Sequence, residues 1–252
     1  MERHRFLCSW FRAHPWILRP DIRRNQLSNR TRALRSRPVR VLHIGPERAL
    51  AHGLGLSDNE HVDYVTGDFE VTPTATASGF VEHRIDVQAI PFPAEHFDVV
   101  LILHVLEHVP NVSRALAELF RVMKPGAVAI IAVPDGRQHA TTREDTGGNM
   151  TAAERLEAFG QVDHVRRFGR DVDQILAAPG FAVKRIEIGK WYASRPEAHR
   201  PYAFRNEEYD PANEFYYTEA VHVVRRPCDR SRLTSQAFYT SVFCRIPTGS
   251  RT

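Results

Sequence analysis

The sequence predicts an α/β fold in which a mostly parallel sheet, beginning near Val39, is covered by helices. Short apolar runs alternate with segments of helical periodicity from this residue onward, which is the pattern of strands joined by crossover helices. Hydrophobic residues make up 42% and charged residues 25% of the 252 positions, a composition that allows one large core. No apolar run reaches the roughly 18 residues that a membrane-spanning helix requires, so we expect a soluble protein without a membrane partner.

Seven segments have the composition of strands. The two most apolar, Phe97–Leu103 and Ala127–Val133, flank a predicted helix over Val112–Met123, whose apolar residues recur at helical spacing. Residues 124–126 (KPG) are expected to end this helix, because proline lacks a backbone donor and glycine permits a turn. The remaining elements are strands over Val39–Ile44, His61–Thr66, Phe80–Ile85 and Phe181–Ile188, a helix over Asp171–Ala178, and a last strand over either Thr218–Arg225 or Gln236–Ile246.

The chain is expected to divide into a basic N-terminal helical extension (1–38), a main domain (39–226) with an inserted loop at about 190–217, and a C-terminal extension (227–252) that could add a strand. Eleven arginines face only two acids within the first 40 residues, a net charge of +9. A transit peptide, a nucleic-acid-binding patch and a helix with one packed side would all be basic in this way. We favour the packed helix, because of an apolar stripe formed by Phe6, Leu7, Trp10, Phe11, Trp16, Ile17 and Leu18.

The cysteines give no sign of a metal site or a disulfide framework. Cys8, Cys228 and Cys244 lie far apart and show no CxxC or other ligand spacing. A reducing, cytoplasmic location therefore fits the chain best, and no metal site is expected.

Acidic side chains follow several of the predicted strands. Ligands bind at the carboxyl ends of parallel strands, so the segments Gly45–Glu47, Gly67–Phe69, Asp86–Val87 and Leu103–His108 should border one crevice. A dinucleotide-binding loop needs glycine where this chain has Glu47, and a carboxylate there would repel a pyrophosphate. The same carboxylate would attract a sulfonium or ammonium group. S-adenosylmethionine is a ligand of this kind, whereas NAD is disfavoured.

The stretch Asp86–Pro134 (DVQAIPFPAEHFDVVLILHVLEHVPNVSRALAELFRVMKPGAVAIIAVP) resembles class I S-adenosylmethionine-dependent methyltransferases over its full length. The segments LHIGPE (42–47) and FGQVDHVRRFGRD (159–171) are similar to a methyltransferase type 11-like subgroup of that superfamily. The resemblance extends from about Val39 to Ile188. It implies a Rossmann-like, doubly wound, mostly parallel seven-stranded sheet with helices on both faces and a last antiparallel strand.

The resemblance also implies how the cofactor would be held. Gly45 would turn beneath the methionine part, and the carboxylate of Asp68 would accept hydrogen bonds from the ribose hydroxyls. Asp86 would accept from the adenine amino group. The first loop departs from the usual glycine-rich motif, with His43 at its acidic position, and Glu47 is a candidate substitute for the missing acid. The full set of expected cofactor-binding residues is Gly45, Pro46, Glu47, Asp68, Phe69, Asp86, Val87, Leu103 and His104.

Three histidines, His104, His108 and His164, are candidate general bases. A base is needed only when the acceptor must lose a proton before it is methylated. His108 could instead fix the turn between strand and helix. Two further groups have open roles: Arg166, Arg167 and Arg170 could bind an acidic acceptor or form a solvated helix face, and Trp191, Tyr192, Tyr202, Phe204, Phe215, Tyr216 and Tyr217 could form an acceptor wall or a satellite core.

The predicted function is methyl transfer from S-adenosylmethionine to a small-molecule or sugar-like acceptor, an activity of class EC 2.1.1. A non-catalytic protein that keeps the fold as a cofactor-binding module or scaffold is the alternative, motivated by the atypical first loop. RNA methylation ranks last, because the Arg-rich segment lacks the interleaved aromatics of a nucleic-acid reader.

Overall fold

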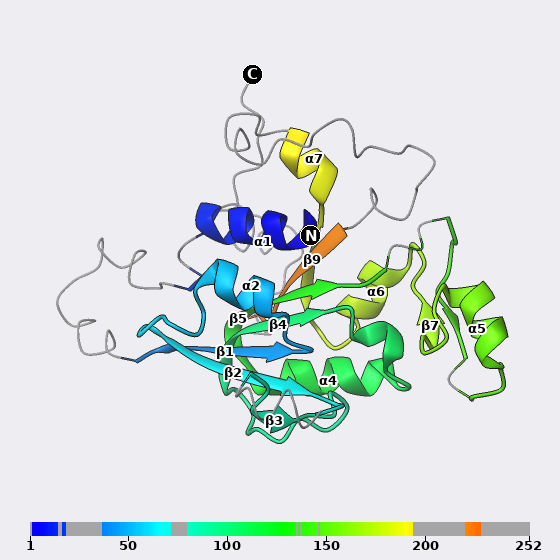
Figure 1. The fold of residues 1–252 in the computed structure, drawn as a ribbon, viewed down its shortest axis with the longest axis horizontal. Helices are drawn as coiled ribbons and strands as arrows, with labels where there is room; N and C mark the ends of the chain where they lie inside the picture. Colours follow the sequence, from blue (N-terminus) through cyan, green and yellow to red (C-terminus); the bar gives the residue numbers. More distant parts are fainter. Residues whose placement is uncertain are drawn as a thin grey trace.

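The computed structural model describes residues 2–14, 17–18, 37–71, 80–134, 136, 138–145, 147–193 and 220–227. Its centre is a seven-stranded sheet in the order β3-β2-β1-β4-β5-β9-β8 (Figure 1). The first five strands pair in parallel, and β9 is antiparallel to both β5 and β8. The predicted α/β fold with a last antiparallel strand is confirmed. The strands are β1 (Val39–Ile44), β2 (Val62–Asp68), β3 (His83–Arg84), β4 (Phe97–Leu103), β5 (Met123–Ala132), β8 (Ala182–Glu187) and β9 (Ala220–Arg225).

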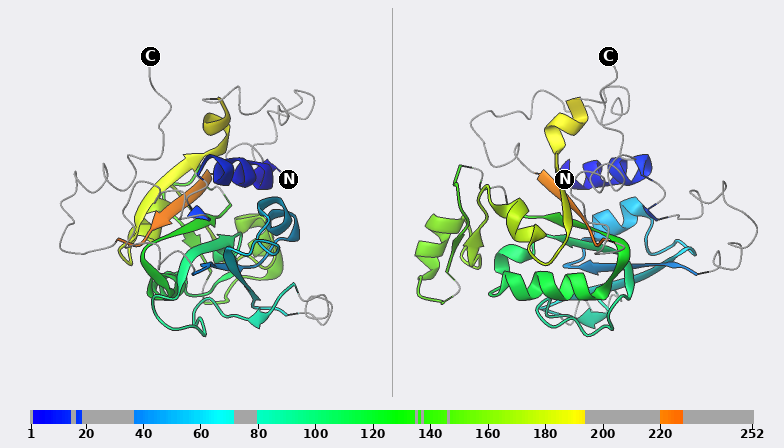
Figure 2. Two further views of the ribbon diagram at one scale, coloured as in Figure 1. Left: turned by 90° about the vertical axis from the view of Figure 1, so that its left-hand side faces the viewer. Right: turned by 180° about the vertical axis from the view of Figure 1, so that it is seen from behind.

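Helices cover both faces of the sheet (Figure 1, Figure 2). Successive residues of β4 point to opposite faces, so that Ile102 packs in the same apolar cluster as helix α4 and Leu101 in the cluster of α1 and α2. Burial on both faces explains why β4 and β5 are continuous apolar runs. The helices are α1 (Glu2–Ala13), α2 (Arg48–Leu54), α4 (Val112–Val122), α5 (Ala152–Phe159), α6 (Val172–Ala177) and α7 (Ile188–Ala193), with a 3-10 helix, η4 (Leu106–His108).

The strand register aligns the carboxyl ends of the central strands. Ile44, the last residue of β1, pairs with Gly67 of β2 on one side and with Ile102 of β4 on the other. Gly67 in turn pairs with His83 of β3. A Cβ on Gly67 would lie 2.2 Å from the Ile85 side chain, so any other residue here would force Ile85 to shift. The loops after β1, β2, β3 and β4 therefore leave the sheet at one edge.

Several predicted boundaries differ from the structure, and the largest differences are at the starts of β3 and β5. β3 pairs only through His83 and Arg84, instead of Phe80–Ile85, because it is a short edge strand after which the chain turns at Asp86. β5 begins at Met123, which pairs with Phe97 across a register irregularity, so residues 124–126 lie inside the strand. The candidate strand Gln236–Ile246 lies outside the described residues, and β9 occupies the other candidate segment.

One substructure was not predicted. The two-residue strands β6 (Arg143–Glu144) and β7 (Arg166–Arg167) pair antiparallel, and they lie with α5 to one side of the main sheet (Figure 2). Thr151 caps α5 by accepting from the Glu154 N–H, while the Glu154 carboxylate accepts from the Thr151 N–H. The T-x-x-E spacing of this capping box was a readable sequence signal for α5.

The N-terminal helix α1 packs on the sheet. Phe6, Leu7, Trp10 and Phe11 are buried in one cluster with residues of β1, β4 and β5. Residues 19–36 lie outside the described part of the chain. Among the helices of the described residues, none is both long and apolar enough to span a membrane.

Candidate functional site

A cleft of about 790 Å³ lies at the carboxyl edge of β1, β2 and β4. All of the predicted site residues except Pro46 and His164 line it, namely Gly45, Glu47, Asp68, Phe69, Asp86, Val87, Leu103, His104 and His108. Glu70, Gln88 and Asp163 also line the cleft and were not predicted. The parallel topology explains why these residues converge on one cleft, because the loops after β1, β2 and β4 each follow a strand that ends at this edge.

Gly45 lets the first loop approach the loop after β4 closely. Its φ is +62°, and a Cβ built on it would lie 2.8 Å from Cγ2 of Val105. The Gly45 N–H donates to the Gly67 carbonyl at 2.9 Å, which fixes the turn to β2. The backbone at Gly45 therefore lines the cleft closely, and a side chain at this position would occupy that space.

His43 stays out of the cleft. It is fully buried, and its Nδ1 lies 2.8 Å from the Tyr64 hydroxyl on β2. Burial raises the pKa of that hydroxyl, so Tyr64 remains protonated. The position where related loops carry an acid therefore has a structural role here, and Glu47 is the acid of this loop that lines the cleft.

The carboxylates of Asp68 and Asp86 are oriented by their own loops. Asp68 Oδ1 accepts from the Glu70 N–H at 3.3 Å, and Asp86 Oδ1 accepts from the Gln88 N–H at 2.8 Å. Such side-chain turns fix the carboxylate rotamer while leaving other lone pairs for a ligand. Both acids thus present oriented acceptors at the β2–β3 side of the cleft.

Phe69 places an aromatic ring in the cleft lining. Its side chain is 56% exposed, which is unusual for a large apolar residue, and the Arg84 guanidinium lies 5.7 Å from the ring centroid. An exposed ring next to two oriented acceptors is suited to a flat heterocycle that carries hydrogen-bond donors.

His104 holds a strained backbone at the end of β4. Its φ is +53°, although it is not glycine, and its N–H donates to the Ala132 carbonyl at 2.9 Å. The imidazole Nδ1 lies 3.1 Å from Oε1 of Glu107. Non-glycine residues in this conformation concentrate at functional sites, where the surrounding structure maintains the strain.

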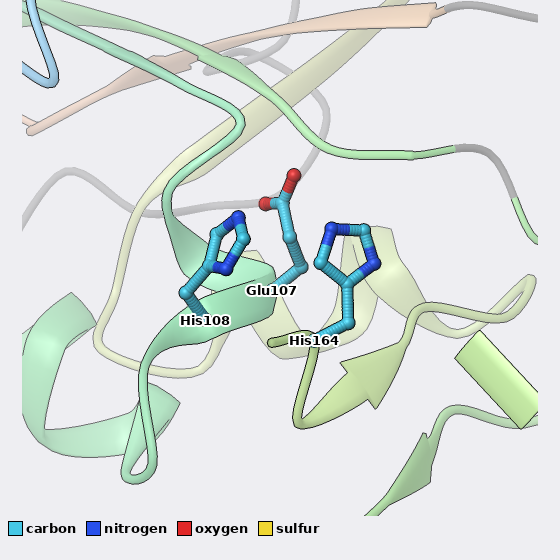
Figure 3. A group of neighbouring side chains, drawn as sticks. All are labelled: Glu107, His108 and His164. Carbon is cyan, nitrogen blue, oxygen red and sulfur yellow. The ribbon is translucent and has the colours of Figure 1, made fainter. Parts of the chain in front are cut away.

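His164 lies behind His108 rather than in the cleft wall. The rings of His108 and His164 meet edge to face with centroids 4.7 Å apart. The Glu107 carboxylate lies close to both rings (Figure 3). His108 Nδ1 lies 3.2 Å from Oδ2 of Asp163, and His164 Nδ1 lies 3.1 Å from the Phe159 carbonyl. Burial lowers the pKa of His164, so its ring is neutral at physiological pH. His164 is therefore not placed to contact a molecule that binds in the cleft.

Arg166 forms neither an acceptor-binding patch nor a solvated helix face. Its guanidinium is buried and donates to the carbonyls of Leu106 and Val109, and to that of Pro110 at 3.0 Å. Its Nε donates to Glu144 at 2.8 Å. Arg166 therefore joins the two-stranded β6–β7 sheet to both ends of η4. Its neighbours in sequence differ from it, since Arg170 is exposed and Arg167 donates to the Ala158 carbonyl.

The aromatic residues proposed for an acceptor wall divide into two groups. Trp191 is buried, and its ring meets Phe6 edge to face at 5.2 Å, so it belongs to the core beneath α1. The other positions are not described for their side chains: Tyr192, Tyr202, Phe204, Phe215, Tyr216 and Tyr217.

Comparison with known proteins gives a family for the region that carries the site. Residues 31–131 match the family described as "Methyltransferase domain". An uncharacterized methyltransferase of Mycobacterium avium is 26% identical over 192 residues, which cover 74% of this chain and 68% of that protein. A 2-phytyl-1,4-naphtoquinone methyltransferase of Synechococcus elongatus is 35% identical over 78 residues, covering 31% of this chain and 33% of that protein.

A solved structure confirms the fold independently. A complex of the Haloferax volcanii Trm112 methyltransferase activator with a methyltransferase aligns with 87% of this chain and 93% of the matched chain, at a TM-score of 0.52 and 13% identity. The match to the quinone-biosynthesis C-methyltransferase of Shewanella pealeana spans only 24% of that relative's length. Together the family match and the fold support the class I methyltransferase superfamily. The methyltransferase domain indicates S-adenosylmethionine as the cofactor, as the sequence predicted.

Proposed function

We propose that this protein transfers a methyl group from S-adenosylmethionine to a small-molecule acceptor that binds at the β4 side of the cleft. The observation that carries the proposal is the convergence of Glu47, Asp68 and Asp86 on one cleft, within the segment that matches a methyltransferase domain. Three carboxylates disfavour a phosphorylated cofactor and favour a cationic one. Relatives named as quinone methyltransferases support a small, flat acceptor.

Each cleft residue receives a role from its position. Asp68 accepts from the ribose hydroxyls, Asp86 accepts from the adenine amino group, and the Val87 amide donates to the adenine ring. The exposed ring of Phe69 packs against the adenine. At the other side, the backbone of residues 45–47 and of Leu103-His104 surrounds the methionine part, where Gly45 provides the room.

Methyl transfer from a sulfonium requires mainly that the reacting atoms are aligned. A sulfonium is an excellent leaving group, so the protein must hold the acceptor atom in line with the methyl group and exclude water. His104 is the proposed base where the acceptor must lose a proton, because it lines the cleft and Glu107 orients its ring. His108 is the second candidate, since it lines the cleft and is paired with Asp163. His164 acts through His108 rather than on the acceptor.

Calorimetry with S-adenosylhomocysteine tests the cofactor site. We expect the wild-type chain to bind it and Asp68→Ala to lose about 10- to 100-fold in affinity, because a hydrogen bond to a charged group contributes roughly 1.5–3 kcal/mol. Asp63→Ala is the matched control, since Asp63 lies on the same strand but pairs with Arg40 outside the cleft. Absence of binding by the wild-type chain contradicts the proposal.

Turnover separates an enzyme from a binding module. Methyl-labelled S-adenosylmethionine is incubated with the protein and pools of quinols, phenols and sugars, and label transfer is measured. Transfer that His104→Asn abolishes, while cofactor affinity stays unchanged, supports the base role. Tight cofactor binding without transfer to any pool would instead favour the scaffold function that the atypical first loop suggests.

A further inference from the structure

Beside the cleft, a carboxylate and two imidazoles converge from two distant segments of the chain. Glu107 and His108 come from η4, and His164 comes from the loop before β7 (Figure 3). One potential ligand atom from each of the three residues lies within 4.8 Å of the others. We propose that Glu107, His108 and His164 bind a divalent transition-metal ion at the β4 end of the cleft. The cysteine spacing gave no sign of this site, because no cysteine takes part in it.

The buried state of Glu107 favours a bound cation. Its side chain is 1% exposed, and Oε1 lies 3.1 Å from Nδ1 of His104. Its Oε2 is buried and has no hydrogen-bond partner among the described residues. A buried carboxylate oxygen without a partner is costly, and a cation is the kind of partner that removes this cost. One carboxylate oxygen of this buried side chain belongs to the cluster that the two histidines complete.

The two imidazoles are oriented as metal ligands usually are. The Phe159 carbonyl can only accept, so His164 carries its proton on Nδ1 and keeps the lone pair on Nε2. His108 has its Nδ1 paired with the Asp163 carboxylate at 3.2 Å, which likewise leaves Nε2 as the ligand atom. Metal-bound histidines are oriented in this manner, with the second ring nitrogen donating to a carbonyl or a carboxylate.

Backbone hydrogen bonds hold the cluster together before any ion binds. The Val165 N–H donates to the Glu107 carbonyl at 3.0 Å, which fixes His164 beside η4. The guanidinium of Arg166 binds the carbonyls of Leu106 and Val109, one on either side of the ligand pair Glu107 and His108. A fixed backbone lowers the entropy that ion binding must offset.

The ligand set selects the kind of ion. Two imidazoles and one carboxylate suit zinc, cobalt or ferrous iron better than magnesium or calcium, which prefer oxygen ligands. Three protein ligands leave a position for water or a substrate oxygen, as catalytic zinc sites do. His108 lines the cleft, so that position is accessible from the acceptor side. A hydroxylated acceptor bound there would lose its proton more readily; this consequence, unlike ion binding, rests on the proposed function.

The test uses the full chain without a histidine tag, stripped with a chelator. Co²⁺ is titrated while the visible absorption is recorded, and Zn²⁺ binding is measured by calorimetry. We expect one equivalent of either ion per chain, with Zn²⁺ displacing the Co²⁺ spectrum. Glu107→Gln and His108→Ala should each weaken binding by about 100-fold or more, since loss of even an outer-shell partner costs 10- to 100-fold. His222→Asn is the matched control, because His222 is a buried histidine beside a carboxylate, Asp173, outside the cluster.

The outcomes are separable. Saturating binding by neither ion, or binding that both variants leave unchanged, overturns the proposal. Circular dichroism and thermal unfolding report whether the variants fold; His108 is half-buried at the cleft wall and its truncation should be tolerated. Should both variants fail to fold, X-ray absorption of the Zn²⁺-loaded wild type decides, because a sulfur ligand would overturn the site and nitrogen and oxygen ligands alone support it. A chain that binds Co²⁺ but not S-adenosylhomocysteine retains the metal site and loses the proposed function.

Discussion

The cleft has a β2–β3 side, where Asp68 ends β2 and Asp86 follows β3, and a β4 side, where His108 lines the wall and Glu107 and His164 lie beside it. On the first side each carboxylate is fixed by its place at or just after the end of a strand, and by a hydrogen bond from the backbone N–H two residues later. On the second side the residues are positioned by hydrogen bonds between segments far apart in the chain, with Arg166 at the centre. The first arrangement follows from topology, and the second depends on a few tertiary contacts. The β4 side should therefore be the more sensitive to a single substitution.

Arg166→Ala is expected to have the largest effect. It removes the donors for three carbonyls of η4 and its flanks, and leaves Glu144 without its ion pair. Breaking a buried charged network costs about 3–5 kcal/mol in the free energy of unfolding. Chemical denaturation measures this loss, and Arg170→Ala, which truncates an exposed arginine nearby, should change stability little. Equal stability of the two variants would show that the buried hydrogen bonds of Arg166 do not stabilise the fold.

Gly45→Ala should have the next largest effect, on the cofactor side. The positive φ costs about 1–2 kcal/mol for a residue with a Cβ, and the new methyl group would meet Val105 at 2.8 Å. Gly55→Ala is a matched control, because Gly55 has nearly the same φ, +60°, with nothing within 4 Å of the added Cβ. Both variants should lose thermal stability, whereas only Gly45→Ala should also lose S-adenosylhomocysteine affinity. Retained affinity in Gly45→Ala would mean that the first loop does not contact the cofactor.

Glu118→Gln tests the support beneath the loop that follows Asp86. Glu118 accepts from the Ile90 N–H and from Arg121, whose guanidinium also donates to the Ile90 and Phe92 carbonyls. The Arg121 hydrogen bond lowers the pKa of Glu118, so the carboxylate stabilises the fold above the unfolded-state pKa. We expect Glu118→Gln to lose about 1.5 kcal/mol of stability at pH 7.

The stability difference between wild type and Glu118→Gln should depend on pH. As the pH falls through the lowered pKa of the folded state, Glu118 takes up a proton and its stabilising contribution is lost. The difference between wild type and Glu118→Gln should therefore shrink below about pH 4.3, the usual glutamate pKa. Unfolding in urea at pH 7 and at pH 3 measures the two differences. A difference that stays constant over this range would show that the ionised form is not what stabilises the loop.

Thr151→Ala should have the smallest effect. It removes the side-chain acceptor for the Glu154 N–H at the start of α5, which costs about 1 kcal/mol. Thr151→Ser keeps the hydroxyl and is the control. Thermal unfolding should show a small loss for Thr151→Ala alone. Since α5 carries the Phe159 carbonyl that orients His164, weaker Co²⁺ binding in this variant would link the cap to the proposed metal site.

The parts of the fold that could be predicted are those with a strong local pattern. The apolar runs of β1 and β4 gave both boundaries correctly, because a strand buried on both faces has few polar residues. β3 was overestimated, because the pairing of an edge strand depends on its single neighbour rather than on its own composition. The two-stranded sheet of β6 and β7 was not predicted for a related reason, since two residues per strand carry no periodicity.

The sequence by itself determined the α/β order, the acids at the strand ends and the departure of the first loop from a dinucleotide-binding motif. These features follow from local periodicity and from the rule that parallel strands end at one edge. Only the tertiary structure decided that the buried Arg166 donates to the carbonyls around η4, that His43 pairs with Tyr64 and that His164 lies near Glu107. Those outcomes depend on which distant carbonyl or hydroxyl satisfies each buried polar group, and the spacing of residues along the chain does not contain that information.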